Sequence, residues 1–164
     1  MPLSAGQALP DVDLTAITPD GPAAKTKAEL FGGKTIALFA VPGAFTPTCN
    51  LNHLPGYVTH ADDILAKGAD AIAVISVNDP FVMTEWKKSG DPDDKILFLA
   101  DGSAAFTEAA DMVLDASGFG MGKRSLRYAA VVDDGVVKSI AVEASPGEAE
   151  QSSASAMLGM LDNG

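Results

Sequence analysis

The sequence predicts an α/β fold in which a central mixed β-sheet carries helices on both faces. Continuous apolar runs alternate with amphipathic segments, which is the pattern of buried parallel strands joined by helices. Near the end of the chain two more strands flank the turn signal Asp133-Asp134-Gly135, which predicts an antiparallel hairpin. The chain has 164 residues and 47% of them are hydrophobic, so we expect a single domain over residues 1–164.

The first buried strand is predicted after a polar segment rich in turn signals. Residues 1–34 contain several Pro and Gly positions, which indicates short strands and turns before the main sheet. Residues 35–41 form an uninterrupted apolar run that stops at Pro42, as expected for a strand buried on both faces. Residues 54–67 carry apolar side chains at a helical period and are followed by Gly68, which predicts a helix and its cap.

The alternation of strand and helix continues through the second half of the chain. Residues 71–77 form another apolar run, and Asn78-Asp79-Pro80 after it can cap and open a helix. The remaining expected elements are that helix to about residue 88, a strand at 96–100, a short helix at 104–110, the hairpin strands at 128–132 and 136–142, and a last helix at 148–161.

Charge and composition exclude several classes of function. Lys and Arg total 11 against 22 Asp and Glu, and the formal net charge of −11 would repel nucleic acid. We find neither a secretory leader nor an apolar run long enough to span a membrane, so a cytoplasmic protein without a membrane partner is expected. One cysteine and two histidines, Cys49, His53 and His60, give no intrachain disulfide and no recognisable metal spacing. We therefore expect no metal and no cofactor.

The single cysteine occupies a position suited to chemistry. Cys49 follows the first buried strand closely and is expected in the first turn of a helix. There, free backbone N–H groups and the positive end of the helix dipole favour a thiolate over a thiol. The alternative is a buried, inert cysteine, since free cysteine is among the most buried residue types.

The residues around this cysteine resemble the peroxiredoxins, specifically the peroxiredoxin 5 or type II subfamily. The hallmark Pro-x-x-x-Thr-x-x-Cys is present as Pro42, Thr46 and Cys49. Further similarity lies at residues 51–56, 76–83, 86, 99–103 and 127–136, so the resemblance covers most of the chain. It implies a thioredoxin-like fold, with Cys49 as the peroxidatic nucleophile and Arg127 as a distant residue that completes the pocket.

The resemblance implies a thiol peroxidase that reduces hydrogen peroxide and alkyl hydroperoxides through a Cys49 sulfenic acid, in antioxidant defence and redox homeostasis. Ionising the thiol fully at neutral pH gains only about 2 kcal/mol, so donors that hold the peroxide oxygens must supply more. Arg127 and Thr46 have the hydrogen-bonding groups for that task. Pro42 is expected to wall the pocket and limit the access of water.

The subfamily often carries a second, resolving cysteine, and this chain lacks it. Val74 stands at one of the two usual places, and Ser152-Ser153 stand near the other. The sulfenic acid must therefore be reduced by external thiols, as in a 1-Cys cycle. The resemblance suggests glutathione with glutaredoxin, or thioredoxin, and the sequence does not choose between them.

The sequence also leads to expectations about the assembly of the protein and about residues near the cysteine. A homodimer is expected through the edge near the active site, where Phe45, Phe81 and Phe119 could supply apolar contacts; the alternative is that they are core aromatics. His53 would share a helix face with the cysteine, either in packing or as a proton shuttle. Arg124 is either part of a solvated basic turn or a source of positive potential near the pocket.

Two other functions compete with the peroxidase. A redox sensor or regulator would use the same sulfenic acid to relay oxidation to a partner protein. A thioredoxin-like disulfide reductase is disfavoured, because Thr46 stands where its Cys-x-x-Cys motif would need a second thiol.

Overall fold

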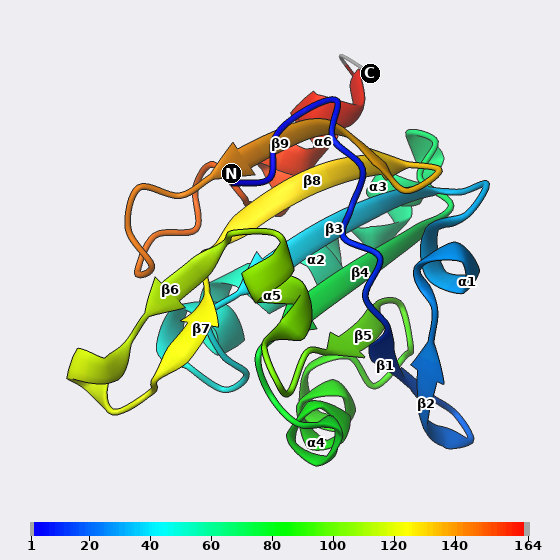
Figure 1. Ribbon diagram of the computed structural model, residues 1–164. Helices are drawn as coiled ribbons and strands as arrows, with labels where there is room; N and C mark the ends of the chain where they lie inside the picture. Colours follow the sequence, from blue (N-terminus) through cyan, green and yellow to red (C-terminus); the bar gives the residue numbers. More distant parts are fainter. Residues whose placement is uncertain (1, 163–164) are drawn as a thin grey trace.

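The computed structural model describes residues 2–162, and of residue 51 the backbone alone. Residue 1 and residues 163–164 of the expected domain lie outside the described residues. The main sheet has seven strands in the order β2-β1-β5-β4-β3-β8-β9 (Figure 1). The strands are β1 (Leu14–Thr18), β2 (Gly21–Lys25), β3 (Thr35–Val41), β4 (Ala71–Ser76), β5 (Leu97–Ala100), β8 (Tyr128–Asp133) and β9 (Val136–Val142).

The sheet is mixed, as the sequence predicts. β3, β4 and β5 are parallel neighbours, whereas β8 pairs antiparallel with β3 and with β9, and β1 pairs antiparallel with β5 and with β2. Because parallel strands end at one edge of a sheet, the loops after β3 and β4 lie beside each other. The single cysteine follows β3 and therefore lies at this edge.

The continuous apolar run of β3 reflects burial on both sides of the sheet. Alternate side chains, among them Leu38, pack into one core cluster, and those between them, among them Phe39, pack into the other. Neither side chain has any exposed surface. The strand therefore needs apolar residues at every position rather than at every second one.

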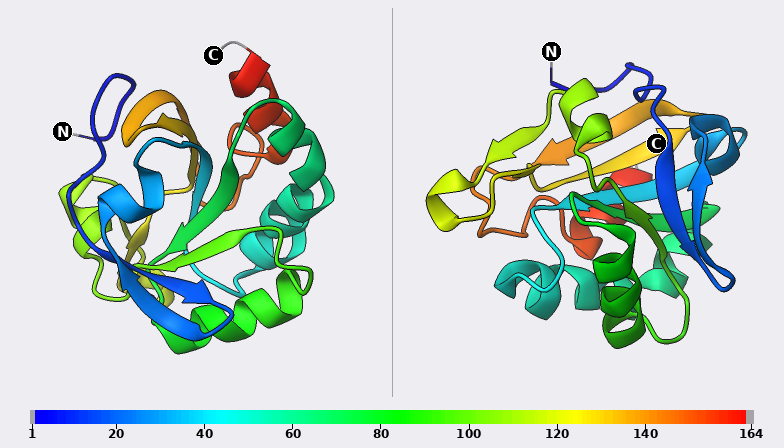
Figure 2. Two further views of the ribbon diagram at one scale, coloured as in Figure 1. Left: turned by 90° about the vertical axis from the view of Figure 1, so that its right-hand side faces the viewer. Right: turned by 60° about the horizontal axis from the view of Figure 1, so that its bottom comes forward.

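Helices cover both faces. α2 (Leu54–Thr59), α3 (Ala61–Ala66), α4 (Pro80–Gly90) and α6 (Ala154–Asp162) lie on one face, and α1 (Lys27–Phe31) and α5 (Ala105–Ala109) lie on the other (Figure 2). Tyr57 and Trp86 anchor the first group in its core, and Phe31 and Phe106 anchor the second. This arrangement confirms the layered α/β architecture.

The helix expected at residues 54–67 starts earlier and is broken. Residues 47 and 48 are already helical, η1 (Cys49–His53) is a π-helical segment, and α2 follows it directly. His60 has φ −99° and ψ 12°, so the helical backbone is interrupted between α2 and α3. Gly68, with φ 110°, follows the end of α3 as expected for a glycine at a helix terminus.

The last helix is shorter than the expected span of 148–161, because its first six residues belong to a loop. α6 begins at Ala154, where the Ser153 hydroxyl oxygen accepts the backbone N–H of Ala156 (3.2 Å) in the manner of an N-cap. The N–H of Ser152 donates instead to Glu143 (2.6 Å). The loop before α6 is thereby tied to the end of β9.

A two-stranded arm was not predicted. β6 (Val113–Asp115) pairs antiparallel with β7 (Lys123–Ser125), and the short 3-10 helix η2 (Ser117–Phe119) lies between them. Figure 1 shows the arm projecting from the main sheet beside the loop that follows β3. Three-residue strands are too short to produce a periodic sequence pattern.

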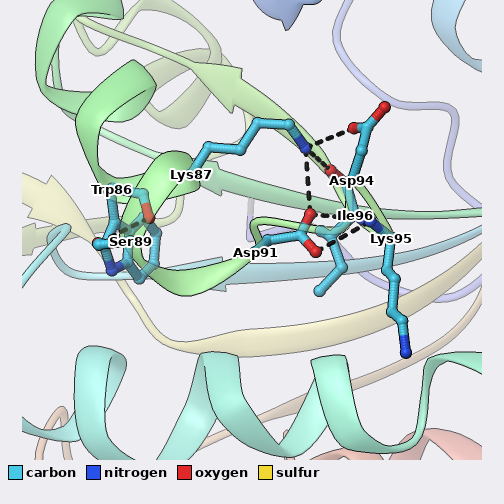
Figure 3. A network of polar contacts seen from close by, with 7 residues as sticks. All are labelled: Trp86, Lys87, Ser89, Asp91, Asp94, Lys95 and Ile96. Atoms are coloured by element: carbon cyan, nitrogen blue, oxygen red, sulfur yellow. Dashed lines mark hydrogen bonds and ion pairs between the residues drawn. The ribbon is translucent and has the colours of Figure 1, made fainter.

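A polar cluster fixes α4 against β5 (Figure 3). Lys87 Nζ donates to the carboxylates of Asp91 (3.1 Å) and Asp94 (2.8 Å). The buried Asp91 carboxylate also accepts two backbone N–H groups just before β5, at 2.9 and 2.8 Å. The same helix carries Trp86, whose Nε1–H donates to Asn50 Oδ1 (3.1 Å), so α4 braces the residue beside the cysteine.

Candidate functional site

The loop after β3 is shaped by a small set of hydrogen bonds. The Thr46 hydroxyl donates to the carbonyl of Gly43 (2.7 Å), and the N–H of Ala44 donates to Asn78 Oδ1 (2.9 Å) from the loop after β4. Phe45 adopts a positive φ of 62°, which turns the chain sharply. The N–H of Asn50 then bonds to the carbonyl of Thr46 (2.8 Å), which starts the helix.

Cys49 lies in the first turns of this helix, as predicted, and its side chain is fully buried. The carbonyl of Cys49 accepts the N–H of Leu54, five residues on, so the helix is locally widened into a π-turn. Such widened turns are frequent at functional sites.

Arg127 reaches the sulfur from the segment that enters β8. Its side chain is buried, and Nη2–H donates to Cys49 Sγ at 2.9 Å. Nε–H donates to the carbonyl of Pro146 (3.1 Å), and Nη1 lies 2.7 Å from His53 Nδ1. A fixed positive charge in contact with the sulfur stabilises any negative charge that the sulfur carries.

His53 is buried between Arg127 and the loop before α6. Its Nε2 lies 2.8 Å from the carbonyl of Ser152, which also accepts the hydroxyl of Tyr57 at 2.7 Å. The pKa of His53 is lowered to about 4, chiefly by burial and also by the neighbouring charge of Arg127, while the Ser152 carbonyl and Glu143 act in the opposite direction. The imidazole is therefore neutral at neutral pH.

A pocket of about 310 Å³ lies next to the cysteine: Cys49 itself is buried and does not line it, but Arg127, which contacts Cys49 Sγ, does. Three residues singled out from the sequence line it: Pro42, Thr46 and Arg127. Since the Thr46 hydroxyl proton is used by Gly43, its oxygen is left to accept a hydrogen bond from a bound molecule. The remaining lining residues are Pro47, Thr48, Leu114, Asp115, Ala116, Phe119, Met121, Pro146 and Gly147.

Arg124 is not part of a solvated turn, so that interpretation was wrong. Its partly buried side chain donates from Nε to the carbonyl of Met121 (3.0 Å) and from Nη1 to the carbonyl of Val77 (3.0 Å). It thus braces the arm against the loop after β4. The neighbouring Lys123 is exposed and pairs with Glu108 (2.8 Å).

Three phenylalanines are exposed: Phe45 in the loop after β3, Phe81 in the first turn of α4 and Phe119 at the end of η2. The exposed fractions are 47% for Phe45, 78% for Phe81 and 82% for Phe119. The alternative that these side chains belong to the core is therefore wrong for Phe81 and Phe119.

The described residues form neither a metal-binding cluster nor a membrane-spanning helix. Within residues 2–162 no group of three or more His, Cys, Asp or Glu side chains is placed to bind a metal ion. Within the same part of the chain no helix has the length and apolar character needed to cross a membrane.

The layered mixed sheet, with one buried thiol at the edge where its parallel strands end, defines a thioredoxin-like redox protein. The redoxin family model matches residues 4–158. The chain belongs to this family, and within it to the peroxiredoxins of the type II or peroxiredoxin 5 kind, which makes it a thiol-dependent peroxidase and an antioxidant oxidoreductase.

Two curated relatives support this assignment by their sequence identity. Chloroplastic peroxiredoxin-2E-2 of Oryza sativa subsp. japonica is 47% identical over 97% of this chain and 72% of its own length. Chloroplastic peroxiredoxin-2E of Arabidopsis thaliana is 45% identical over 97% of this chain and 69% of its own length.

Solved structures agree with the sequence comparison. Reduced Prx3 of Vibrio vulnificus, crystallised in complex with hydrogen peroxide, has a TM-score of 0.90 and 48% identity, over 97% of this chain and 99% of that one. Peroxiredoxin 5 of Alvinella pompejana has a TM-score of 0.88 and 36% identity, over 99% of this chain and 100% of that one. The thioredoxin-like fold is thereby confirmed.

The lowered pKa of His53 predicts a pH dependence of stability. Between its ordinary pKa of 6.5 and about 4 the unfolded chain binds a proton that the folded chain excludes. The free energy of unfolding therefore falls as pH falls through this window, by up to about 3 kcal/mol in total. Urea unfolding at a series of pH values would measure this loss.

A His53→Phe variant should lack this part of the acid destabilisation, whereas His60→Asn should keep it, because it leaves His53 unchanged. Equal pH dependence in wild type and His53→Phe would contradict the assignment.

Proposed function

We propose that Cys49 is the peroxidatic nucleophile of this peroxidase. Its thiolate attacks one oxygen of hydrogen peroxide or an alkyl hydroperoxide, and the O–O bond breaks. The sulfur becomes a sulfenic acid, and the other oxygen leaves as hydroxide or alkoxide, which takes up the proton released when the thiol ionised and becomes water or an alcohol. The observation that carries this proposal is the 2.9 Å contact from Arg127 Nη2 to Cys49 Sγ, because Arg127 also lines the pocket.

Arg127, Thr46 and Pro42 are proposed to bind the peroxide, to orient it and to restrict water. Arg127 has N–H groups left over to donate to the peroxide oxygens, and its charge stabilises the leaving oxygen as negative charge develops there. Thr46 accepts the O–H of the peroxide and so orients it. Pro42 closes one side of the pocket and restricts water.

The apolar lining supports alkyl hydroperoxides as substrates besides hydrogen peroxide. Leu114, Phe119 and Met121 come from the arm and its connection, and they offer an apolar surface beside the proposed peroxide position. A hydrocarbon tail would leave water on binding there, which favours association.

Regeneration of the thiol is proposed to use external thiols, because the chain has one cysteine. A first thiol condenses with the sulfenic acid, releasing water and forming a mixed disulfide. A second thiol attacks that disulfide, restores the Cys49 thiolate and leaves as an oxidised thiol pair. Glutathione with glutaredoxin and thioredoxin are the two candidate systems.

Steady-state peroxide consumption with each system tests this cycle. We expect turnover with one of the two, and its loss when Cys49 is alkylated beforehand. Oxidation of Cys49 without turnover in either system would instead favour the alternative, a sensor that passes its oxidation to a partner protein.

A homodimer through the face that carries Phe45, Phe81 and Phe119 is part of the proposal. Exposed aromatic side chains of this size are enriched at protein interfaces. We expect light scattering to give twice the chain mass at micromolar concentration and Phe81→Glu to shift the protein toward monomer. Leu65→Glu, at a 41% exposed position on α3, is the matched control and should leave the mass unchanged. A monomeric wild type would remove the dimer.

The cytoplasmic location and the single domain over residues 1–164 stay predictions. Two of the relatives are named as chloroplastic proteins.

A further inference from the structure

His53 uses both of its ring nitrogens inside the protein. Arg127 Nη1 lies 2.7 Å from Nδ1, and the Ser152 carbonyl lies 2.8 Å from Nε2. A guanidinium can only donate and a carbonyl can only accept, so the geometry fixes the proton arrangement. Nδ1 is the acceptor and Nε2 carries the single ring proton.

This arrangement determines how the guanidinium of Arg127 is oriented. Of its five N–H groups, three have partners: the Pro146 carbonyl, His53 Nδ1 and Cys49 Sγ. One N–H on each terminal nitrogen has no partner among the described residues, and Arg127 lines the pocket. Without the Nδ1 acceptor, rotation of the planar group would misplace both the contact to sulfur and the free N–H groups.

The imidazole is itself held firmly. The Ser152 carbonyl also accepts the Tyr57 hydroxyl (2.7 Å), and the Ser152 N–H and hydroxyl both donate to Glu143 Oε2 at 2.6 Å. The ring packs against Phe39, with 4.9 Å between centroids. Its Nδ1 lone pair therefore has a defined direction.

We propose that His53 is a positioning residue for the peroxidase reaction: as a neutral imidazole anchored on Ser152, it fixes the guanidinium of Arg127 against Cys49 Sγ and toward the pocket. This inference rests on the proposed roles of Arg127 and Cys49. It differs from a proton shuttle, because Nδ1 has no proton to give and Nε2–H is donated to the Ser152 carbonyl.

Three variants separate the two hydrogen bonds of the ring. His53→Asn places an amide oxygen near the position of Nδ1 and can still accept from Arg127. His53→Gln places its amide near the position of Nε2 and keeps only the contact to Ser152. His53→Phe keeps the ring and removes both hydrogen bonds. His60→Asn is the matched control outside the site.

For each variant, two rate constants of Cys49 are compared: oxidation by hydrogen peroxide and alkylation by iodoacetamide. Alkylation is the reference reaction, because it does not need a hydrogen-bond donor that holds the two peroxide oxygens. We expect His53→Phe and His53→Gln to react about 10- to 100-fold more slowly with peroxide, as for one lost hydrogen bond to a charged group. Alkylation should change less than about 3-fold, and His53→Asn should keep most of the peroxide rate.

Unchanged peroxide oxidation in His53→Phe would overturn the inference. Equal losses with both reagents would overturn it too, because the variant would then act on the thiolate or on the fold and not on the donors to the peroxide oxygens. If wild-type Cys49 itself reacts no faster than a free thiol, the proposed function fails instead. Nitrogen-15 spectra of the wild-type histidine rings test the arrangement independently of activity. We expect a protonated Nε2 and a bare Nδ1 at neutral pH, and any other form at His53 would overturn the inference.

Discussion

Replacing Cys49 by serine should abolish the rapid reaction with hydrogen peroxide. A serine hydroxyl keeps the size of the side chain, but it is not ionised at neutral pH and cannot form a sulfenic acid. Trp86, the one tryptophan of the chain, donates to Asn50 beside the cysteine, so its fluorescence should report the oxidation. Stopped-flow mixing of reduced wild type with stoichiometric peroxide should give a fast fluorescence change that the variant lacks.

Intact mass should show the gain of one oxygen atom in wild type and no gain in Cys49→Ser. The variant must keep the circular dichroism of the wild type, which separates lost chemistry from lost structure. If folded and fully reduced wild type is oxidised no faster than free cysteine, Cys49 is not the peroxidatic residue and returns to the class of inert buried thiols.

The sheet was predictable because its strands obey a simple rule. β3 spans the predicted residues 35–41 without change, since burial on both faces demands an apolar residue at each position. The hairpin at Asp133-Asp134-Gly135 was predictable as well, because positive φ values at Asp134 (50°) and Gly135 (78°) require the residue types that the sequence shows there.

One helix was not predicted, although the sequence carries a signal for its first residues. α1 begins with a capping box in which Thr26 and Glu29 bond each other's backbone N–H groups, and this Thr-x-x-Glu pattern is visible in the sequence. The interruption at His60 and the π-turn at Cys49 were not predicted from the sequence.

The residues proposed for the reaction could be named from the sequence, whereas the wall of the pocket around them could not. Cys49, Thr46, Pro42 and Arg127 were named from the family motif, and the structure places them around one pocket, in its lining or directly against a lining residue. The pocket wall from the arm was missed, because three-residue strands leave no pattern. The link from His53 through Ser152 joins positions 99 residues apart, so only the folded chain shows it.

Replacing Arg127 should produce the second large effect on the peroxide reaction. Its guanidinium is the one cationic group in contact with Cys49 Sγ among the described residues, at 2.9 Å, and it is buried. Removing one such donor from a buried reaction site costs about 10²- to 10³-fold in rate. We expect Arg127→Met to lose at least that much in the rate constant for oxidation by peroxide.

Comparison with Arg127→Lys separates charge from geometry. Lysine restores a positive charge, but its single ammonium cannot reach the Pro146 carbonyl, His53 Nδ1 and Cys49 Sγ together as the planar fork does. We therefore expect Lys to recover only a minor part of the loss. The exposed Lys123, changed to Met, removes the same charge from the chain without touching the pocket and should leave the rate within about 2-fold. An Arg127→Lys variant as fast as wild type would mean that charge alone suffices, and that the three directed contacts of the guanidinium contribute nothing to the reaction.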